Sequence, residues 1–286
     1  MSLMTVFAFF SFALGAVVAS FLNVVIWRVP RGESIVSPPS HCPSCGALIR
    51  WWQNIPIISF LLLRGRCAGC KVKISPRYVI VEAIGAVLFL ATFMHFKDYL
   101  PDADFRIETI LEIIVWWIWI SLMIVGSFID FDHKLLPDFT TVGGMMLGVG
   151  YWALVALGHN DYALDFLDFR MYLPLIWSLG GLVFGFGLLW LIRFLGSKAF
   201  GREAMGMGDV FLMGAVGALF GPVAVLLTMI LSSFFGALVG LSMIRLSKTR
   251  LGGFCEIPYG PYICLGNLVW MFWGNEIVRW YLEGLK

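Results

Sequence analysis

Four cysteines in one polar segment have the spacing of a metal site. Cys42 and Cys45 form one Cys-x-x-Cys pair, Cys67 and Cys70 form a second, and 21 residues separate the two pairs. Each such turn directs two thiolates at one ion, and four sulfur ligands in a tetrahedron suit Zn²⁺ best. The spacing therefore predicts a structural zinc ion, because four cysteines leave no open position for water. Two disulfides or free thiols are the alternative interpretation.

Two aspartates at the ends of hydrophobic runs are candidates for acid–base chemistry. Asp130 ends one run, and Asp209 opens another directly after Gly206-Met-Gly208. A carboxylate at the rim of an apolar segment is costly, which makes each one a hypothesis for function. If the two approach closely, one takes a proton while the other remains a base, and such a pair can activate water for attack on a peptide carbonyl. The alternative is two solvated helix-end acids, with Asp209 favoured by the helix dipole.

Other polar residues near these candidates are expected to have lesser roles. Asp132 and Asp138 are interpreted as rim residues, His41 as a loop histidine, and Cys255 and Cys264, which lack paired spacing, as structural residues. The chain contains no His-Glu-x-x-His and no Gly-x-Ser-Gly. These absences argue against a zinc metalloprotease and against a serine protease of the membrane.

The elements that must position these residues are transmembrane helices. Of the 286 residues, 60% are hydrophobic and 13% charged, and the mean hydropathy is +0.88. About 20 helical residues cross a bilayer core. The sequence therefore predicts an all-α polytopic membrane protein with about eight transmembrane helices. They are expected near residues 3–27, 78–96, 109–129, 139–157, 172–195, 208–220, 222–244 and 259–280.

The helix pattern divides the chain into three expected parts. Residues 1–27 form a retained first helix, residues 28–77 form the four-cysteine loop, and residues 78–286 form a transmembrane bundle. Gly221-Pro222 is the signal that separates the sixth helix from the seventh, so a count of seven is the alternative.

Charge predicts the orientation of this bundle. With eight helices, 15 of the 20 Lys and Arg residues fall on one side of the membrane, and this count includes those of the loop at 28–77. Short basic loops stay cytoplasmic, so both termini should face outward. Asp130 and Asp209 should then lie at the cytoplasmic ends of their helices. The net charge of +2 argues against nucleic acid as a partner. The lipid bilayer, with its anionic headgroups, is the expected partner of the basic side.

An ordered set of motifs resembles the bacterial type IV prepilin peptidases over nearly the whole chain. The set comprises Gly15-Ala-Val-Val-Ala-Ser20-Phe-Leu-Asn23, the cysteine loop with Asn54-Ile-Pro56 and Leu63-Arg64-Gly65, Arg77-Tyr78 with Glu82, Ile129-Asp130 through Leu136-Pro137-Asp138, Gly206-Met-Gly208-Asp209, and Ile257-Pro258-Tyr259-Gly260-Pro261.

The resemblance implies an activity and assigns roles. It makes Asp130 and Asp209 the two catalytic aspartates of a peptidase that cleaves after the glycine ending a basic leader, on the cytoplasmic face of the bacterial inner membrane. The implied substrates are type IV prepilins or type II secretion pseudopilins. The cysteine loop is typical of bifunctional members, which then methylate the new N-terminus with S-adenosylmethionine.

The methyl-transfer site is not evident from the sequence, because no glycine-rich strand-to-helix fingerprint is present. Its candidates are Glu33, Asn23, Arg64, Arg77, Tyr78 and Glu82, each of which has a loop or packing role as its alternative. If Glu82 has no functional role, it is expected to pair with a nearby arginine.

Some features depart from the family pattern or need an explanation of their own. Phe211 stands where members often carry lysine, and Val79 where they often carry proline. A basic leader must also approach a basic protein surface. An acidic rim that would attract it is expected from Glu33, Asp132, Asp138, Glu203 and Glu256.

Two other classes of function compete with the peptidase. The first is a membrane transporter with cation-binding acids, but the helix centres are mostly Leu, Val, Phe, Trp and Gly, so a polar pathway is hard to draw. The second is a non-catalytic assembly factor for a pilus or secretion system, against which the intact Asp130 and Asp209 argue.

Overall fold

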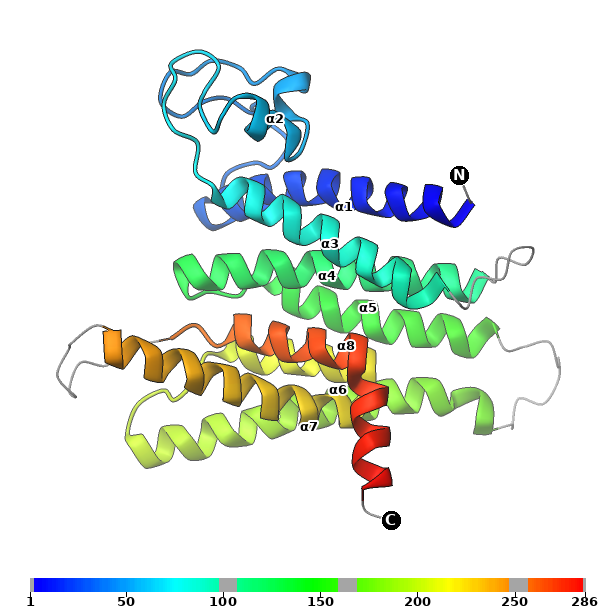
Figure 1. Ribbon diagram of the computed structural model, residues 1–286. Coiled ribbons are helices and arrows are strands. Elements are labelled where there is room, and N and C mark those ends of the chain that lie inside the picture. Colours follow the sequence, from blue (N-terminus) through cyan, green and yellow to red (C-terminus); the bar gives the residue numbers. More distant parts are fainter. Residues whose placement is uncertain (1–2, 98–106, 159–168, 247–256, 285–286) are drawn as a thin grey trace. The chain divides into compact units, whose positions relative to one another are not determined.

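The computed structural model describes residues 3–97, 107–158, 169–246 and 257–284, and these residues are almost entirely helical with no strand. The elements are α1 (Leu3–Arg28), η1 (Val29–Arg31), η2 (Trp51–Asn54), α2 (Ile58–Leu62), α3 (Arg77–Phe96), α4 (Ile107–His133), α5 (Asp138–Gly158), α6 (Phe169–Phe200), α7 (Met207–Leu246) and α8 (Gly260–Glu283) (Figure 1). They form two compact units, an N-terminal unit of residues 1–125 and a C-terminal unit of residues 126–286.

The described helices confirm the prediction of an all-α polytopic membrane protein. Six of them are long and apolar enough to cross a bilayer. Their spans are Leu3–Arg31, Arg77–Phe96, Glu108–His133, Asp138–Leu157, Leu173–Phe200 and Met207–Met243. The count of eight spans is not confirmed, because α8 is not in this set and the predicted sixth and seventh helices form one element, α7.

The α7 element breaks at Gly221, where φ is 79° and ψ is 179°. This backbone region is open essentially only to glycine, and Pro222 disfavours helical geometry at the residue before it. Gly221-Pro222 thus ends one helical arm (207–220) and starts a second (222–246).

The two arms of α7 run in opposite directions. In the first arm, Met213 lies against Gly185 of α6. In the second arm, Ser232 bonds to Tyr259 at 2.6 Å, just before α8 begins. Figure 1 shows the chain folding back on itself at this break. Because of this reversal, both ends of α7 lie toward the same side of the C-terminal unit.

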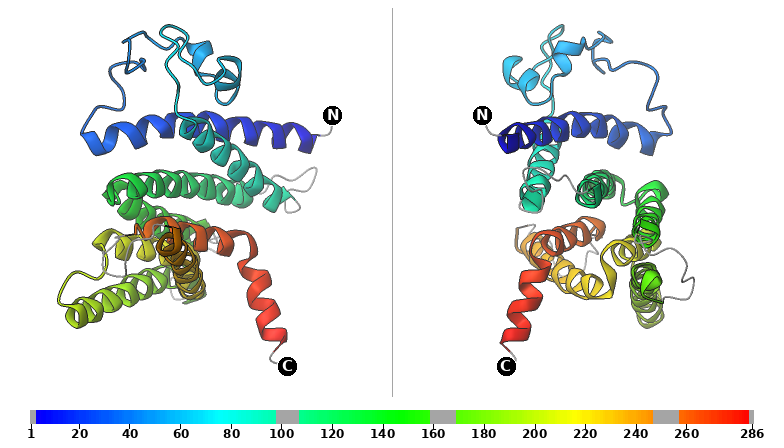
Figure 2. Two further views of the ribbon diagram at one scale, coloured as in Figure 1. Left: turned by 60° about the vertical axis from the view of Figure 1, so that its left-hand side comes forward. Right: turned by 90° about the vertical axis from the view of Figure 1, so that its right-hand side faces the viewer.

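Small residues allow the helices to pack closely. In the N-terminal unit, Gly15 of α1 faces Gly85 of α3, and a Cβ at Gly15 would lie 2.5 Å from the Gly85 carbonyl oxygen. Figure 2 shows that α1 and α3 cross at an angle. In the C-terminal unit, Gly181 of α6 and Gly217 of α7 make an equivalent contact. Such contacts replace the hydrophobic driving force that is missing between helices in lipid.

Candidate functional site

The C-terminal unit brings the two predicted aspartates together. Asp130 lies in the last turn of α4 and Asp209 in the first turn of α7, and their residues are only 5% and 8% exposed. The two carboxylates are close enough to act on each other electrostatically. Two residues that are 79 positions apart in the chain therefore form one buried acidic pair, which excludes the interpretation of separate, solvated helix ends.

Backbone N–H groups orient each carboxylate. The N–H of Gly260, at the start of α8, donates to Oδ2 of Asp130 over 3.0 Å in a buried position. The N–H of Gly206 donates to the carboxylate of Asp209. Hydrogen bonds from fixed backbone donors hold a carboxylate in one orientation at little entropic cost.

Two glycines pack closely beside the acidic pair. A Cβ at Gly260 would lie 2.8 Å from Asp130 Oδ2 and 3.2 Å from Leu136. A Cβ at Gly208 would lie 2.8 Å from Cβ of Leu136. Leu136 thus packs against both glycine backbones. A larger residue at Gly260 would displace the Asp130 carboxylate or the leucine.

Sequence reasoning missed part of this site. Gly260 was part of a quoted motif, but nothing in the sequence indicated that its N–H binds Asp130. Cys264, one helical turn further along α8, was expected to be structural, and its buried thiol lies close to both aspartates and bonds to Ser127. The only available signal was the four-residue spacing from Gly260, which places Cys264 on the same helix face.

The remaining acidic candidates lie outside the pair. Asp132 and Asp138 are exposed, as expected of rim residues. Glu203 is also exposed and forms an ion pair of 2.9 Å with Arg193. Glu256 and Cys255 lie outside the described residues.

The four predicted cysteines form one cluster in the N-terminal unit. The Sγ atoms of Cys42, Cys45, Cys67 and Cys70 all lie within 4.8 Å of one another, and His41 is not part of the group. The Cys42 and Cys70 sulfurs are 3.9 Å apart. A tetrahedron with metal–sulfur bonds of about 2.3 Å has edges of about 3.8 Å, so this spacing fits a metal. It is far too long for a disulfide, which excludes that alternative for the Cys42–Cys70 pair.

Two turns of the same design present the four thiols. Cys42 N–H donates to the Ala47 carbonyl over 2.9 Å, and Cys67 N–H donates to the Val72 carbonyl over 2.9 Å. Each turn carries a residue with positive φ, Gly46 in the first and Lys71 in the second. Hydrogen bonds from the backbone N–H groups of Cys70 and Gly69 lower the pKa of Cys67 to about 6. The second turn therefore favours the thiolate at Cys67, whereas burial and the neighbouring thiols raise the pKa of Cys70 to about 11.

The methyl-transfer candidates separate into two groups. Asn23, Tyr78 and Glu82 lie where α1 packs against α3, and Asn23 Nδ2 donates to the Tyr78 carbonyl over 3.1 Å. Glu82 is buried and accepts the N–H of Ile57 over 2.7 Å, a backbone partner that the sequence did not indicate. Glu33 and Arg64 are exposed loop residues, and Arg77 begins α3.

Comparisons with known proteins agree on one family. Residues 13–96 match the bacterial peptidase A24 N-terminal domain, and residues 117–241 match the type IV leader peptidase family. The prepilin leader peptidase/N-methyltransferase of Pseudomonas aeruginosa is 34% identical, with 94% of this chain and 91% of that protein covered. The protein of the same name from Legionella pneumophila is 34% identical, with coverages of 96% and 92%.

A third relative is longer than this chain. The prepilin leader peptidase/N-methyltransferase of Myxococcus xanthus is 39% identical over 253 residues, which are 86% of this chain and 65% of that protein. No solved structure matches the chain significantly.

Proposed function

The chain belongs to the type IV leader peptidase family, and we propose that it removes the leader of type IV prepilins or pseudopilins and then methylates the new N-terminus. The observation that carries the first activity is the buried pair of Asp130 and Asp209, with backbone donors on both carboxylates. Hydrolysis of a peptide by water needs one group that accepts a proton and one that donates a proton, and this pair supplies both.

The proposed cleavage uses the two aspartates as general base and general acid. Two carboxylates held close together in a poorly solvated site cannot both ionise easily, so they share one proton. The ionised member takes a proton from water, and the hydroxide that forms attacks the scissile carbonyl carbon. The protonated member donates its proton to the carbonyl oxygen. The peptide C–N bond then breaks as the nitrogen takes up a proton, and no covalent enzyme intermediate is formed.

The backbone contacts give the pair its geometry. Gly260 N–H occupies Oδ2 of Asp130, which leaves Oδ1 available for water. Gly208 and Gly260 carry no Cβ beside the pair, so a substrate backbone meets less steric hindrance there than it would beside larger residues.

The four-cysteine cluster is proposed to hold Zn²⁺ in a structural role. Four thiolates fill the tetrahedron, so the ion stabilises the fold of the loop and takes no part in bond breaking. The methyl donor is proposed to be S-adenosylmethionine.

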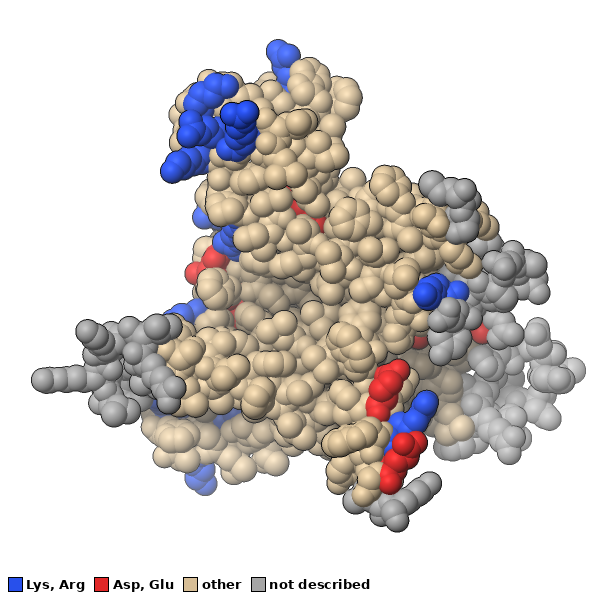
Figure 3. Space-filling view, in the orientation of Figure 1, with Lys and Arg blue, Asp and Glu red and all other residues tan. Residues whose placement is uncertain are grey.

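The location of the site is proposed to be the cytoplasmic side of the bacterial inner membrane. The loop between α1 and α3 exposes basic residues, some of which are visible in Figure 3. Arg50, Arg66, Lys71 and Lys73 are examples. Such loops stay in the cytoplasm.

A cleavage assay with matched variants tests the peptidase proposal. The purified protein in detergent is given a prepilin with its leader, and kcat is compared between wild type, Asp130→Asn, Asp209→Asn and the control Asp132→Asn. Loss of an acid or base group lowers rates by about 10²- to 10⁴-fold, so each catalytic variant should lose cleavage on this scale. Asp132→Asn removes an exposed carboxylate from the same helix end and should retain the wild-type kcat.

The outcomes of this assay are distinct. Cleavage by both Asn variants at the wild-type rate would refute the aspartate pair. Equal loss in Asp132→Asn would show that general acidity at this helix end, and not the pair, controls the rate. Zinc content and thermal unfolding of all four proteins establish that they are folded.

A further inference from the structure

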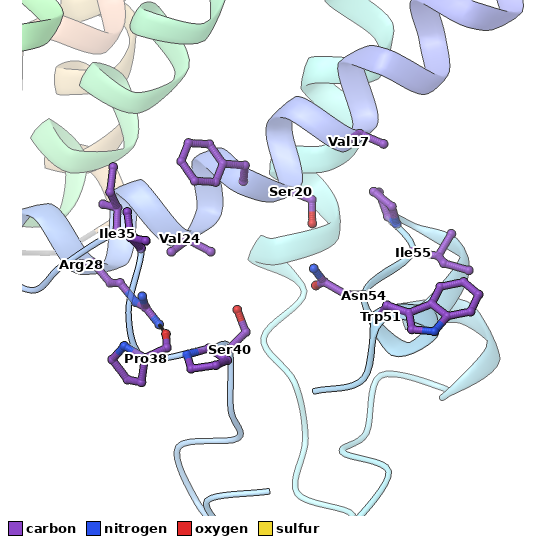
Figure 4. A pocket seen from close by; sticks show the side chains of 14 residues that line it. Val17, Ser20, Val24, Arg28, Ile35, Pro38, Ser40, Trp51, Asn54 and Ile55 are labelled. Carbon is purple, nitrogen blue, oxygen red and sulfur yellow. Dashed lines mark hydrogen bonds between the residues drawn. The ribbon is translucent and has the colours of Figure 1, made fainter. Parts of the chain in front are cut away.

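We propose that the N-terminal unit binds the methyl donor in a pocket between α1 and the four-cysteine loop, an inference that rests on the proposed methylation. The pocket has a volume of about 520 Å³, within the range of small-molecule sites. Residues of the C-terminal half of α1 form one wall, and segments 35–40 and 51–56 of the loop form the others (Figure 4).

A buried positive charge lies in this pocket. Arg28 is 8% exposed, and its Nη1 and Nη2 donate to the carbonyl oxygens of Ser34 and Pro38 over 2.8 and 2.7 Å. Both acceptors are neutral, and no carboxylate pairs with Arg28 among the described residues. A guanidinium has five N–H donors, so three remain. A buried charge is stabilised by an opposite charge, and a carboxylate that enters the pocket would supply it.

A strained turn forms part of the pocket wall. Ile57 has φ 63° and ψ −51°, and the N–H of Ile58 donates to the Pro56 carbonyl. This γ-turn is rare, and a β-branched residue with positive φ is an outlier. Pro56 lines the pocket directly before the turn.

A buried carboxylate on α3 holds that turn in place. Oε2 of Glu82 accepts the Ile57 N–H over 2.7 Å. Strained backbone persists only where its surroundings determine it, and it concentrates at binding sites. Glu82 is therefore a positioning residue for the pocket, while Arg28 is its binding residue.

The other lining groups match a nucleoside attached to an amino acid. Phe21, Trp51 and Ile55 provide apolar and aromatic surface for a purine ring. Ser20, Ser40 and Asn54 provide hydroxyl and amide groups for a ribose and an amino group. S-Adenosylmethionine carries all of these groups together with one carboxylate, which fits the single arginine.

The reaction in this pocket is a direct methyl transfer. The neutral α-amine of the newly exposed residue attacks the methyl carbon, the N–C bond forms, and the C–S bond breaks. The sulfonium becomes a neutral thioether, and the amine then releases one proton to solvent. The amine is the leaving group of the preceding cleavage, so the substrate of this site is the product of the peptidase.

A binding assay on the full-length protein tests the pocket. Binding of S-adenosylhomocysteine, the unreactive product, is measured by calorimetry for wild type, Ser20→Trp and Arg28→Lys. Ser20→Trp places a large side chain in the pocket and leaves Arg28 itself unchanged. Arg28→Lys keeps the charge but loses the planar fork. Each should weaken binding by about tenfold or more, equivalent to about 1.4 kcal/mol. Phe9→Trp is the matched control, because Phe9 is an exposed residue of α1 outside the pocket.

Prepilin processing by the same preparations separates the two proposals. The pocket variants should cleave the leader at the wild-type rate and yield product that lacks one methyl group by intact mass. Wild-type affinity and methylation in both variants would refute the pocket assignment alone. A wild-type protein that cleaves but neither binds the probe nor methylates would refute the proposed methylation itself.

A phospholipid phosphate is the other anion that Arg28 would accept. Glycerol 3-phosphate, added at millimolar concentration, should leave S-adenosylhomocysteine binding unchanged if the site is selective for the methyl donor. Displacement of the probe by glycerol 3-phosphate would assign the pocket to lipid headgroups and overturn the proposal.

Discussion

The four-cysteine cluster and the aspartate pair are built in opposite ways. The cluster lies in the N-terminal unit, and its four thiols come from two turns within 29 consecutive residues, Cys42 to Cys70. The pair lies in the C-terminal unit, and its carboxylates and main backbone donor come from α4, α7 and α8. A cluster made by local turns can be predicted from the spacing of its cysteines, whereas a pair made by helix packing depends on the fold of the whole unit. In the proposed function, the first serves stability and the second serves chemistry.

The largest expected effect is the loss of the metal from the cluster. Cys67→Ser removes one of four thiolates, and structural zinc contributes about 10 to 16 kcal/mol to the folding of small domains. The variant should lose stoichiometric zinc, measured by atomic emission, and its loop at 28–77 should become sensitive to protease. Cys264→Ser is the control, because Cys264 is outside the cluster. Retention of full zinc by Cys67→Ser would contradict the four-ligand site.

The thiols of the same cluster predict how zinc affinity depends on pH. The pKa of Cys67 is lowered to about 6 and that of Cys70 is raised to about 11, so protons compete with a metal for Cys70 over the whole neutral range and for Cys67 only below about 6. Metal binding requires thiolates, and zinc affinity should therefore fall as the pH is lowered, most steeply below about 6. Titration with a zinc-sensitive dye measures the release.

The next effect sharpens the contrast at the aspartate pair. Gly260→Ala should lower kcat by about 10²-fold while zinc content is unchanged, because the new Cβ would lie 2.8 Å from Asp130 Oδ2 and misplace an acid–base group. Gly187→Ala is the matched control in the same unit, since a Cβ at Gly187 meets nothing within 4 Å. An unchanged kcat in Gly260→Ala would show that the Asp130 carboxylate tolerates displacement.

The smallest expected effect concerns the acidic rim. The double variant Asp132→Asn/Asp138→Asn removes two exposed carboxylates from the C-terminal unit. Exposed charges contribute little and are screened by salt, so KM for a basic leader should rise about threefold at low ionic strength, with kcat unchanged. The difference should vanish in high salt. A KM that does not change at low salt would exclude the rim as the attraction for the leader.

The sequence alone predicted the helices, the four-cysteine cluster and the family. Apolar runs of membrane-spanning length are a local property, and the predicted range 78–96 differs from the observed helix Arg77–Phe96 by one residue. The cluster was predictable because each Cys-x-x-Cys turn sets its own geometry. The roles of Asp130 and Asp209 came from the resemblance and stay predictions until they are tested.

Only the tertiary structure decided which groups surround the carboxylates and where a ligand fits. The Gly260 N–H lies 130 residues from Asp130, and the buried thiol of Cys264 reaches the pair from α8. In the N-terminal unit, Glu82 supports the Ile57 turn from another helix. No spacing encodes these contacts, because they arise where separate helices pack. Local chemistry thus determined the elements and the four-cysteine cluster, and packing between elements determined the acidic pair and the pocket.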